Sequence, residues 1–497
     1  MARKSIYVNG WAYCATFIII YTLFVSYLLT GTLYEYCVES ASMTPFYLNA
    51  VFVHDTVTNP WGLFVFLSEG LMASFSTPWI GTAIYILLGI VLAALIACSV
   101  APKGALRNPH PMSGIALCVP VLLLIPFVSG GYTIFTNKQH GDEFAWLFLL
   151  LVVFAVLAVL RRFLPMKSLS MPIGRVMSGI ISFVVLLAAM FYTYSETCRD
   201  ENFTAIITMK HAIERGDYNA VLEEAAKHPE PTRLQVMFTR LALFATGQSG
   251  EATYTYPDGD APYDTEQASL MTRVIGATLL YYNYGKLNYA YRWAMEDMVE
   301  YGERPAYIIY MYKIAVMNGE NELAARYTET LRTSPFYRNA AHIPDAERVR
   351  IGLLTNYTNS LEGDRTLIER YLLDGFVATV GGNEQMQQLT LDASLVLKDI
   401  PTFWPVFANL AKRCISDNTR IPRHYQEAAL LFSRLRGTPD LTGLPLDPAI
   451  CQQFEELVAA SAANSHMGED YNASALRPRF GGTYWYYYFF VNDLKAR

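Results

Sequence analysis

Three acidic residues in the N-terminal third of the chain lie where a carboxylate could do chemistry. Glu35 and Glu39 directly follow the first long apolar stretch, and Asp55 stands beside His54 before the next one. A carboxylate positioned beside a reacting hydroxyl can take its proton as a general base. These three acids are therefore the candidate catalytic residues. The alternative interpretation is that they are ordinary solvated acids of a loop.

The sequence lacks the motifs of metal enzymes and nucleotide-binding proteins. Its eight histidines are scattered, with no H-x-x-x-H or H-E-x-x-H spacing, and no C-x-x-C occurs; metal sites need such clustered ligands. The pair Gly381 and Gly382 lacks the Lys-Ser/Thr of a phosphate-binding loop. We therefore expect no metal and no other cofactor, which favours a non-enzymatic role.

Four of the seven cysteines could form disulfide bridges. Cys37 and Cys198 both follow apolar stretches closely, and Cys414 and Cys451 lie in the polar half of the chain. Each pair could close in an oxidising compartment. Buried free thiols are an equal alternative for both pairs.

Clusters of tyrosine offer candidate binding residues. Aromatic side chains on the concave face of a helical array make good anchors for a peptide, and this singles out four positions: Tyr282, Tyr284, Tyr291 and Tyr310. Most tyrosines of these clusters are expected to pack between helices. The aromatic run from Tyr484 to Phe490 is too apolar for a solvated tail, so it should pack in a core or at a membrane surface.

Five apolar stretches are long enough to cross a bilayer, which takes about 20 helical residues. They are residues 11–33, 79–100, 113–135, 144–160 and 176–194. A further stretch, residues 60–75, is amphipathic but too short to span before Pro78. We expect it to be an interfacial helix, with Trp61 and Trp79 at headgroup depth. Residues 1–197 are thus the predicted transmembrane domain.

The basic residues of this domain fall on one side of the predicted spans. Eight of its nine Lys and Arg residues precede the first span or lie after the second and the fourth, and Lys138 is the exception. Cytoplasmic loops carry such an excess. We therefore predict a multi-pass protein of the cytoplasmic (inner) membrane with a cytoplasmic N-terminus. Residues 198–497 would then be periplasmic.

The C-terminal part has the composition of a water-soluble domain. From Glu196 on it carries 29 basic and 38 acidic residues, and this net charge of −9 argues against nucleic acid, which needs a positive surface. Apolar residues recur at helical spacing, and glycines mark three helix-turn-helix points between about 204 and 340. Gly319, Ala324 and Pro335 resemble the tetratricopeptide repeat. That resemblance implies an α-solenoid, so the predicted fold class is all-α.

Three further motifs carry a resemblance that spans nearly the whole chain. They are Pro-Trp-Gly at Pro60–Gly62, Pro-Trp-x-Gly at Pro78–Gly81, and the aromatic ending at Gly481–Phe490. The chain is similar to an uncharacterised family of bacterial inner-membrane proteins with an N-terminal multi-span region and a C-terminal repeat-like domain. The resemblance brings no established activity with it.

Two functions follow from these observations as hypotheses. The first is a membrane-anchored scaffold whose periplasmic solenoid binds an envelope protein or peptide, because repeat patterning is present and a catalytic constellation is not. The alternative is a transferase similar to glycosyltransferases that use lipid-linked sugars, since those enzymes place a catalytic base where Glu35 and Glu39 lie. Membrane lipid is the other expected partner. The oligomeric state is left open.

Overall fold

The chain is described from a computed structural model of its 497 residues. The residues described are 10–100, 109–163, 174–258, 270–359, 368–379, 381–437 and 441–491. Within these ranges every regular element is a helix and there is no strand, which confirms the all-α fold class. Several residues behind the predicted orientation lie outside the described residues: Arg3, Lys4, Lys103, Arg107 and Lys167.

The chain divides into two compact units. Unit 1 is Met1–Thr204 together with Asp297–Tyr312 and Asn321–His342. Unit 2 is Ala205–Glu296, Lys313–Glu320 and Ile343–Arg497. Unit 1 therefore takes in two segments that lie well beyond the apolar part of the sequence.

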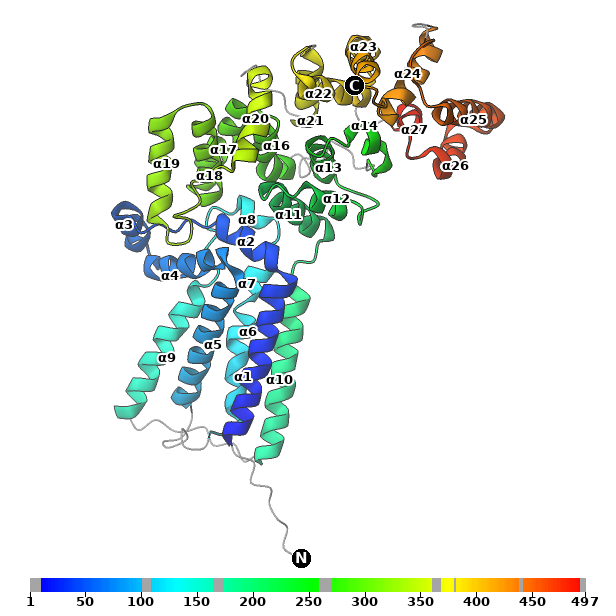
Figure 1. The fold of residues 1–497 in the computed structure, drawn as a ribbon. Helices are drawn as coiled ribbons and strands as arrows, with labels where there is room; N and C mark the ends of the chain where they lie inside the picture. The colour runs from blue at the N-terminus through cyan, green and yellow to red at the C-terminus, as the bar shows by residue number, and fades with distance from the viewer. Residues whose placement is uncertain are drawn as a thin grey trace, which may run out of the picture. The chain divides into compact units, whose positions relative to one another are not determined.

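Long apolar helices lie side by side in unit 1 (Figure 1). Four stretches are long and apolar enough to cross a membrane: Gly10–Thr32, Pro78–Val100, Pro111–Val128 and Arg175–Glu196. They correspond to α1 (Gly10–Ser26) with a π-helical turn (Tyr27–Thr32), α5 (Pro78–Val100), a 3-10 turn (Pro111–Leu117) with α6 (Cys118–Leu122) and α7 (Ile125–Val128), and α10 (Arg175–Glu196). The apolar part of α9 (Ala145–Phe163), at the predicted fourth span, is shorter. The count of five spans thus stays a prediction.

Prolines interrupt the third apolar stretch, and hydroxyl groups of neighbouring helices donate to carbonyls near the interruption. Pro120 and Pro126 have no N–H to donate, so the helix is interrupted between α6 and α7. The Tyr85 hydroxyl donates to the Pro120 carbonyl at 2.6 Å, and the Thr193 hydroxyl donates to the Val121 carbonyl at 3.1 Å. Backbone groups in hydrocarbon need such internal partners, so the bundle suits a membrane.

Short helices cover one end of this bundle. They are α2 (Tyr34–Ser42), α3 (Ala50–Thr58), α4 (Gly62–Ala73) and α8 (Thr133–Thr136). α4 packs against α5 and α9 and runs across their ends (Figure 1). The side chains of α2 and α4 that face inward include polar ones, which builds a polar layer at this end.

A buried arginine ties a distant segment of the sequence into unit 1. Arg304 is 1% exposed, and its guanidinium donates to the carbonyls of Ile134 at 2.8 Å and Asn137 at 2.6 Å. Hydrogen bonds from a charged donor to buried carbonyls are among the stronger ones in proteins. These bonds explain why residues 297–312 belong to unit 1 although they follow so late in the chain.

Unit 2 consists of helices joined by short turns. They are α11 (Glu201–Glu214, whose first turn belongs to unit 1), α12 (Tyr218–Ala225), α13 (Arg233–Ala245), α14 (Ser249–Ala252), α16 (Thr278–Asn283), α17 (Leu287–Tyr301), α18 (Pro305–Met317), α20 (Asp345–Thr358), α21 (Ile368–Ala378), α22 (Glu384–Val396), α23 (Ile400–Ser416), α24 (Arg423–Arg436), α25 (Pro448–Asn464), α26 (Glu469–Phe480) and α27 (Tyr484–Phe490); α17 ends and α18 begins in unit 1, which also holds α19 (Asn321–Thr333). Consecutive helices pack in pairs, such as α12 with α13 and α21 with α22.

Glycines end the helices at the turn points. Gly216 has φ +73°, and the N–H of the next residue, Asp217, donates to the Ala212 carbonyl at 2.9 Å. Gly285 and Gly319 adopt the same left-handed conformation, which L residues other than glycine rarely accept.

The terminal aromatic run is part of the core of unit 2. It forms α27, in which Tyr484, Trp485 and Tyr487 are buried. The Trp485 indole N–H donates to the Glu427 carbonyl at 2.7 Å, and the Tyr484 ring stacks edge-on against Phe432 of α24. Packing against α24 therefore accounts for the aromatic composition.

Candidate functional site

The polar layer at the covered end of unit 1 is built around a histidine–carboxylate pair. His140 lies in the loop before α9 and is 3% exposed. Its Nδ1 is 2.7 Å from Oε1 of Glu143, and its Nε2 is 3.1 Å from the Ser40 carbonyl of α2. A carboxylate on one ring nitrogen and a carbonyl on the other hold the imidazole in one orientation. We call His140, Asp142, Glu143, Ser68 and Glu69 the polar layer.

Gly141 allows this loop to close against α4. Its φ of +117° and its surroundings both call for glycine, because a Cβ there would stand 2.9 Å from Thr44 Cγ2 and 3.0 Å from Glu69 Cγ. The Gly141 N–H donates to Oε2 of Glu143 at 2.8 Å. Its carbonyl accepts from the Ser68 hydroxyl at 2.5 Å. The loop is thereby fixed to the helix that carries Glu69.

The two glutamates of the polar layer are pushed toward opposite protonation states. Burial, with the nearby charges of Asp142 and Glu143, raises the pKa of Glu69 to about 8. Burial acts in the same direction on Glu143, but the charge and hydrogen bond of His140 and the Gly141 N–H leave its pKa below the ordinary value. A neutral carboxyl beside an ionised one is the arrangement that can separate an acid from a base. The layer can hold one proton at neutral pH.

The structure does not bring the three predicted catalytic acids together. Glu39 is fully buried on α2, one residue before Ser40, whose carbonyl contacts the polar layer. Glu35 is half-buried in the first turn of the same helix. Asp55 lies on the exposed helix α3, where its side chain is 73% exposed and 3.3 Å from His54. Among the three, only Glu39 lies next to buried polar groups.

Three of the four predicted partner-binding tyrosines are buried. Tyr282 and Tyr284 belong to unit 2, and Tyr310 belongs to unit 1; each is less than a tenth exposed. Tyr291 is half-buried on α17. A partner could reach Tyr291 without a rearrangement, whereas the other three would first have to leave their packed positions.

All seven cysteines carry free thiols in the structure. Cys37 is buried and its thiol donates to the Leu29 carbonyl at 3.5 Å, while Cys198 is half-buried. Cys414 is buried and Cys451 is half-buried. Pairing of Cys37 with Cys198, or of Cys414 with Cys451, in an oxidising compartment stays a prediction.

An ion-pair network that the sequence did not suggest lies inside unit 2. Arg233 of α13 makes a bidentate contact with Glu369 of α21, with both N–O distances 2.6 Å. Arg240, two turns further along α13, also donates to Glu369 at 2.6 Å and contacts Asp258. Asp258 lies 18 residues from Arg240, but Glu369 is more than a hundred residues from both arginines, so no local pattern could reveal these charged partners. Buried and mutually neutralising, they hold helices together and leave no group open to a substrate.

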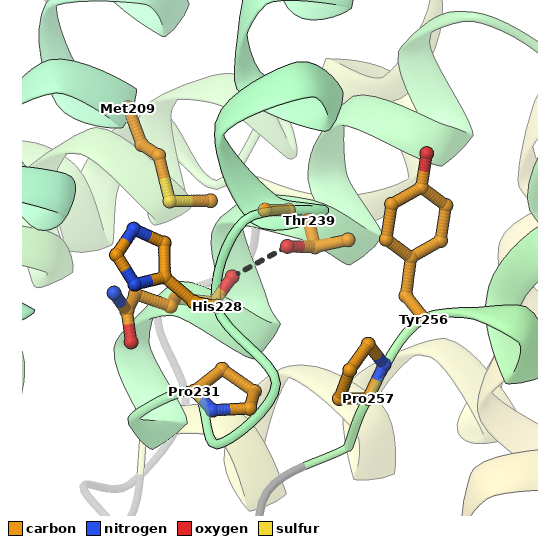
Figure 2. Close-up of a pocket in the computed structure, with 8 residues that line it drawn as sticks. Met209, His228, Pro231, Thr239, Tyr256 and Pro257 are labelled. Atoms are coloured by element: carbon orange, nitrogen blue, oxygen red, sulfur yellow. Dashed lines mark hydrogen bonds between the residues drawn. The ribbon is translucent and has the colours of Figure 1, made fainter.

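Figure 2 shows a small hollow in unit 2, lined among others by Met209, His228 and Tyr256. It leaves no room for a water-sized molecule, whereas pockets for small molecules begin at roughly 300 Å³. Thr239, in its wall, donates to the Gln235 carbonyl at 2.8 Å, and His228 is 3.2 Å from Glu224. Thr239 and His228 are thus engaged with neighbours, whereas the buried side-chain nitrogen of Gln235 has no hydrogen-bond partner among the residues that the structure describes. In the same described residues, no three or more His, Cys, Asp or Glu side chains group as a metal site would require.

One helix of unit 2 exposes an apolar face. On α20, Val349 is 64% exposed, Leu353 42% and Tyr357 40%. These three positions are four residues apart, so they form a single stripe along the helix; we call them the α20 stripe. The opposite side of α20 is anchored by Ile351 and Leu354, which are fully buried. A helix that is apolar on two faces is expected to have both covered.

Comparison with known proteins places the chain in a family. No curated protein and no solved structure matches it. A family model does match, over residues 125–491, which include the loop from His140 to Glu143 and nearly all of unit 2. The prediction of a family without an assigned activity is confirmed. The chain belongs to the family of unknown function DUF6057.

Proposed function

We propose that the chain is a membrane-anchored scaffold whose helical part binds an amphipathic helix of another envelope protein along the α20 stripe. The observation that carries this proposal is the exposure of Val349, Leu353 and Tyr357 at one-turn spacing. Anchors at i, i+4 and i+8 fit the apolar face of a second helix, a recurring mode of peptide recognition.

Contacts within unit 2 hold α20, and with it the α20 stripe, in a fixed orientation. Besides the buried Ile351 and Leu354, two polar contacts fix the sides of α20: Lys313 Nζ is 2.9 Å from Glu347 Oε1, and Arg350 donates to the Asn283 side chain at 2.6 Å. A rigid helix loses little conformational freedom on binding. Leu353 is 42% exposed, so covering it contributes roughly 1 kcal/mol of the about 1.5–3 kcal/mol that full burial of a leucine gives.

The solenoid and the periplasmic location belong to this proposal. Helix pairs with left-handed glycines at their turns support a tetratricopeptide-like array. Arg161 near the end of α9 and Arg175 at the start of α10 lie at the end of the bundle away from α2 and α4 (Figure 1). Basic residues at that end support a cytoplasmic assignment for it, and so a periplasmic one for the helical part. An inner-membrane protein of bacterial type is part of the same proposal.

Site-specific photocrosslinking in living cells tests the scaffold. A photoreactive residue at Val349 should give a discrete crosslinked envelope protein, whereas one at the exposed Arg348, on another face of α20, should not. Leu353→Ala should weaken the complex about tenfold, the equivalent of 1.4 kcal/mol. Crosslinking of equal strength from Val349 and Arg348, or a complex indifferent to Leu353→Ala, would contradict the proposal.

The alternative candidate is a transferase acting on a lipid-linked sugar at the same face of the membrane. The burial of Glu39 beside the polar layer, in which Glu69 stays protonated near neutral pH, favours it. Glu39→Gln and Glu35→Gln, in protein that remains folded and abundant, separate the two functions. Loss of an envelope glycan with the partner complex intact favours the enzyme, and an unchanged glycan favours the scaffold.

A further inference from the structure

The turn between α3 and α4 presents a tryptophan outward. Trp61 has φ +65°, a left-handed conformation that is costly for a bulky residue. The next residue, Gly62, donates its N–H to the Asn59 carbonyl at 2.9 Å, and a Cβ on it would stand 2.0 Å from the Thr56 carbonyl oxygen. The Pro-Trp-Gly motif is therefore a tight turn that only glycine can close, and it leaves the indole 65% exposed.

The second tryptophan motif does the same at the start of α5. Pro78 is the first residue of that helix, where a missing N–H has no consequence. A Cβ on Gly81 would stand 2.5 Å from the Phe75 ring, so the glycine lets the preceding turn pack closely on α5. Trp79, between them, is 64% exposed. Each motif thus holds a tryptophan whose indole is mostly exposed.

Most of the large exposed side chains in the hairpin formed by α3 and α4 are apolar, and His54 and Asp55 are its one exposed ionisable pair. The exposed side chains of this hairpin include Leu48, Val51, Leu63 and Leu67. Its inner side carries Ser68 and Glu69 of the polar layer, both buried. Between residues 43 and 78 the only ionisable acids or bases besides Glu69 are His54 and Asp55. A hairpin facing water on all of its outer side would carry more charges there than this one pair.

We propose that the hairpin of α3 and α4 lies in the boundary between lipid headgroups and acyl chains, with Trp61 and Trp79 setting its depth. The occupant of its apolar face is phospholipid, because this face continues the exposed apolar surface of the bundle: α4 packs against α5 and α9, where Ile80 and Trp146 are also more than half exposed. Helices of this kind bury their apolar side about 5–10 Å below the headgroups. Tryptophan concentrates at that depth.

Fluorescence quenching of the full-length protein in phospholipid vesicles tests this assignment. The difference in fluorescence between wild type and Trp61→Phe is the emission of Trp61. Phospholipid brominated close to the headgroup should quench this component strongly, and aqueous acrylamide should quench it weakly. Trp404→Phe, which removes a half-buried indole of unit 2, is the matched control: its lost component should be insensitive to brominated lipid.

Two results would overturn the proposal. Quenching of the Trp61 component by acrylamide and not by brominated lipid would place the turn in water. Insensitivity to both quenchers would mean that protein covers the face, and size measurements in detergent would then show whether a second copy does so. Because Trp61→Phe keeps an aromatic ring in the turn, thermal unfolding of the variant checks that the fold is retained.

Discussion

Replacing Glu69 by glutamine should change how stability depends on pH. The Glu69 carboxyl has an ordinary pKa of 4.5 and a folded-state pKa of about 8. The unfolded chain therefore releases this proton near pH 4.5, while the folded protein keeps it until about pH 8. As pH rises between these values the unfolded state is favoured progressively. The stabilisation is complete below pH 4.5 and has been lost once the pH passes 8.

The size of the stability difference follows from the pKa shift of Glu69. Each pH unit inside this window is worth about 1.4 kcal/mol for one fully shifted group. Wild type should thus lose about 3 kcal/mol between pH 5 and pH 7 relative to the glutamine variant, which has no proton to release. The other groups of the polar layer are the same in both proteins, so the difference between the two reports on Glu69.

Thermal unfolding of both proteins in detergent, from pH 5 to pH 9, measures this difference. The apparent Tm of Glu69→Gln should match wild type near pH 5, exceed it increasingly toward pH 8, and keep a constant lead above that. Asp55→Asn, at an exposed position, is the control and should show no such trend. A constant Tm difference at every pH would show that Glu69 is not held neutral by its surroundings.

Three further substitutions test the packing. Glu369→Gln should lower stability by about 3–5 kcal/mol in chemical unfolding, because Arg233 loses its buried bidentate partner; a loss below 1 kcal/mol would show the pair to be solvated. Gly141→Ala should lower the Tm more than Gly216→Ala, since only the former also meets neighbouring side chains; equal losses would mean that backbone conformation alone matters there. Tyr85→Phe should cost about 0.5–1.5 kcal/mol through the lost bond to a carbonyl in the bundle, and unchanged resistance to heat would argue that the bond is not formed.

Apolar continuity made the bundle helices predictable. The stretch expected at residues 79–100 is α5, Pro78–Val100, because an uninterrupted apolar run has few other structures available. The third stretch was expected to reach residue 135 but its long helical part ends at Val128. Gly130 follows, and Gly131 has φ +51°, so the backbone leaves the helix at that point.

The polar layer could not be read from the sequence. His140 and Glu143 stand close together in a short loop, but Glu69 lies some seventy residues earlier, and the bonds of Ser68 to Gly141 and Phe144 join the two segments. No spacing along the sequence links Glu69 with Glu143. The one local signal was a single carboxylate within the otherwise apolar stretch 60–75, which suggests a charge turned inward.

The sequence pattern of unit 2 does not show which of its apolar side chains are exposed. Tyr282 and Tyr284 drew attention as candidate anchors, yet both are buried. The α20 stripe was not predicted as a binding surface, because Val349, Leu353 and Tyr357 have the spacing of any helix side that faces a core. Which of two apolar faces a helix buries depends on its neighbours in space, and those neighbours come from distant parts of the chain.

A reporter enzyme that is active only after export, fused behind Arg497, tests the central claim most directly. A scaffold anchored in the inner membrane with its helical part in the periplasm predicts full reporter activity in intact cells. It also predicts no activity for the same reporter inserted between α5 and the Pro111 turn. Activity at the internal position and none behind Arg497 would contradict the account.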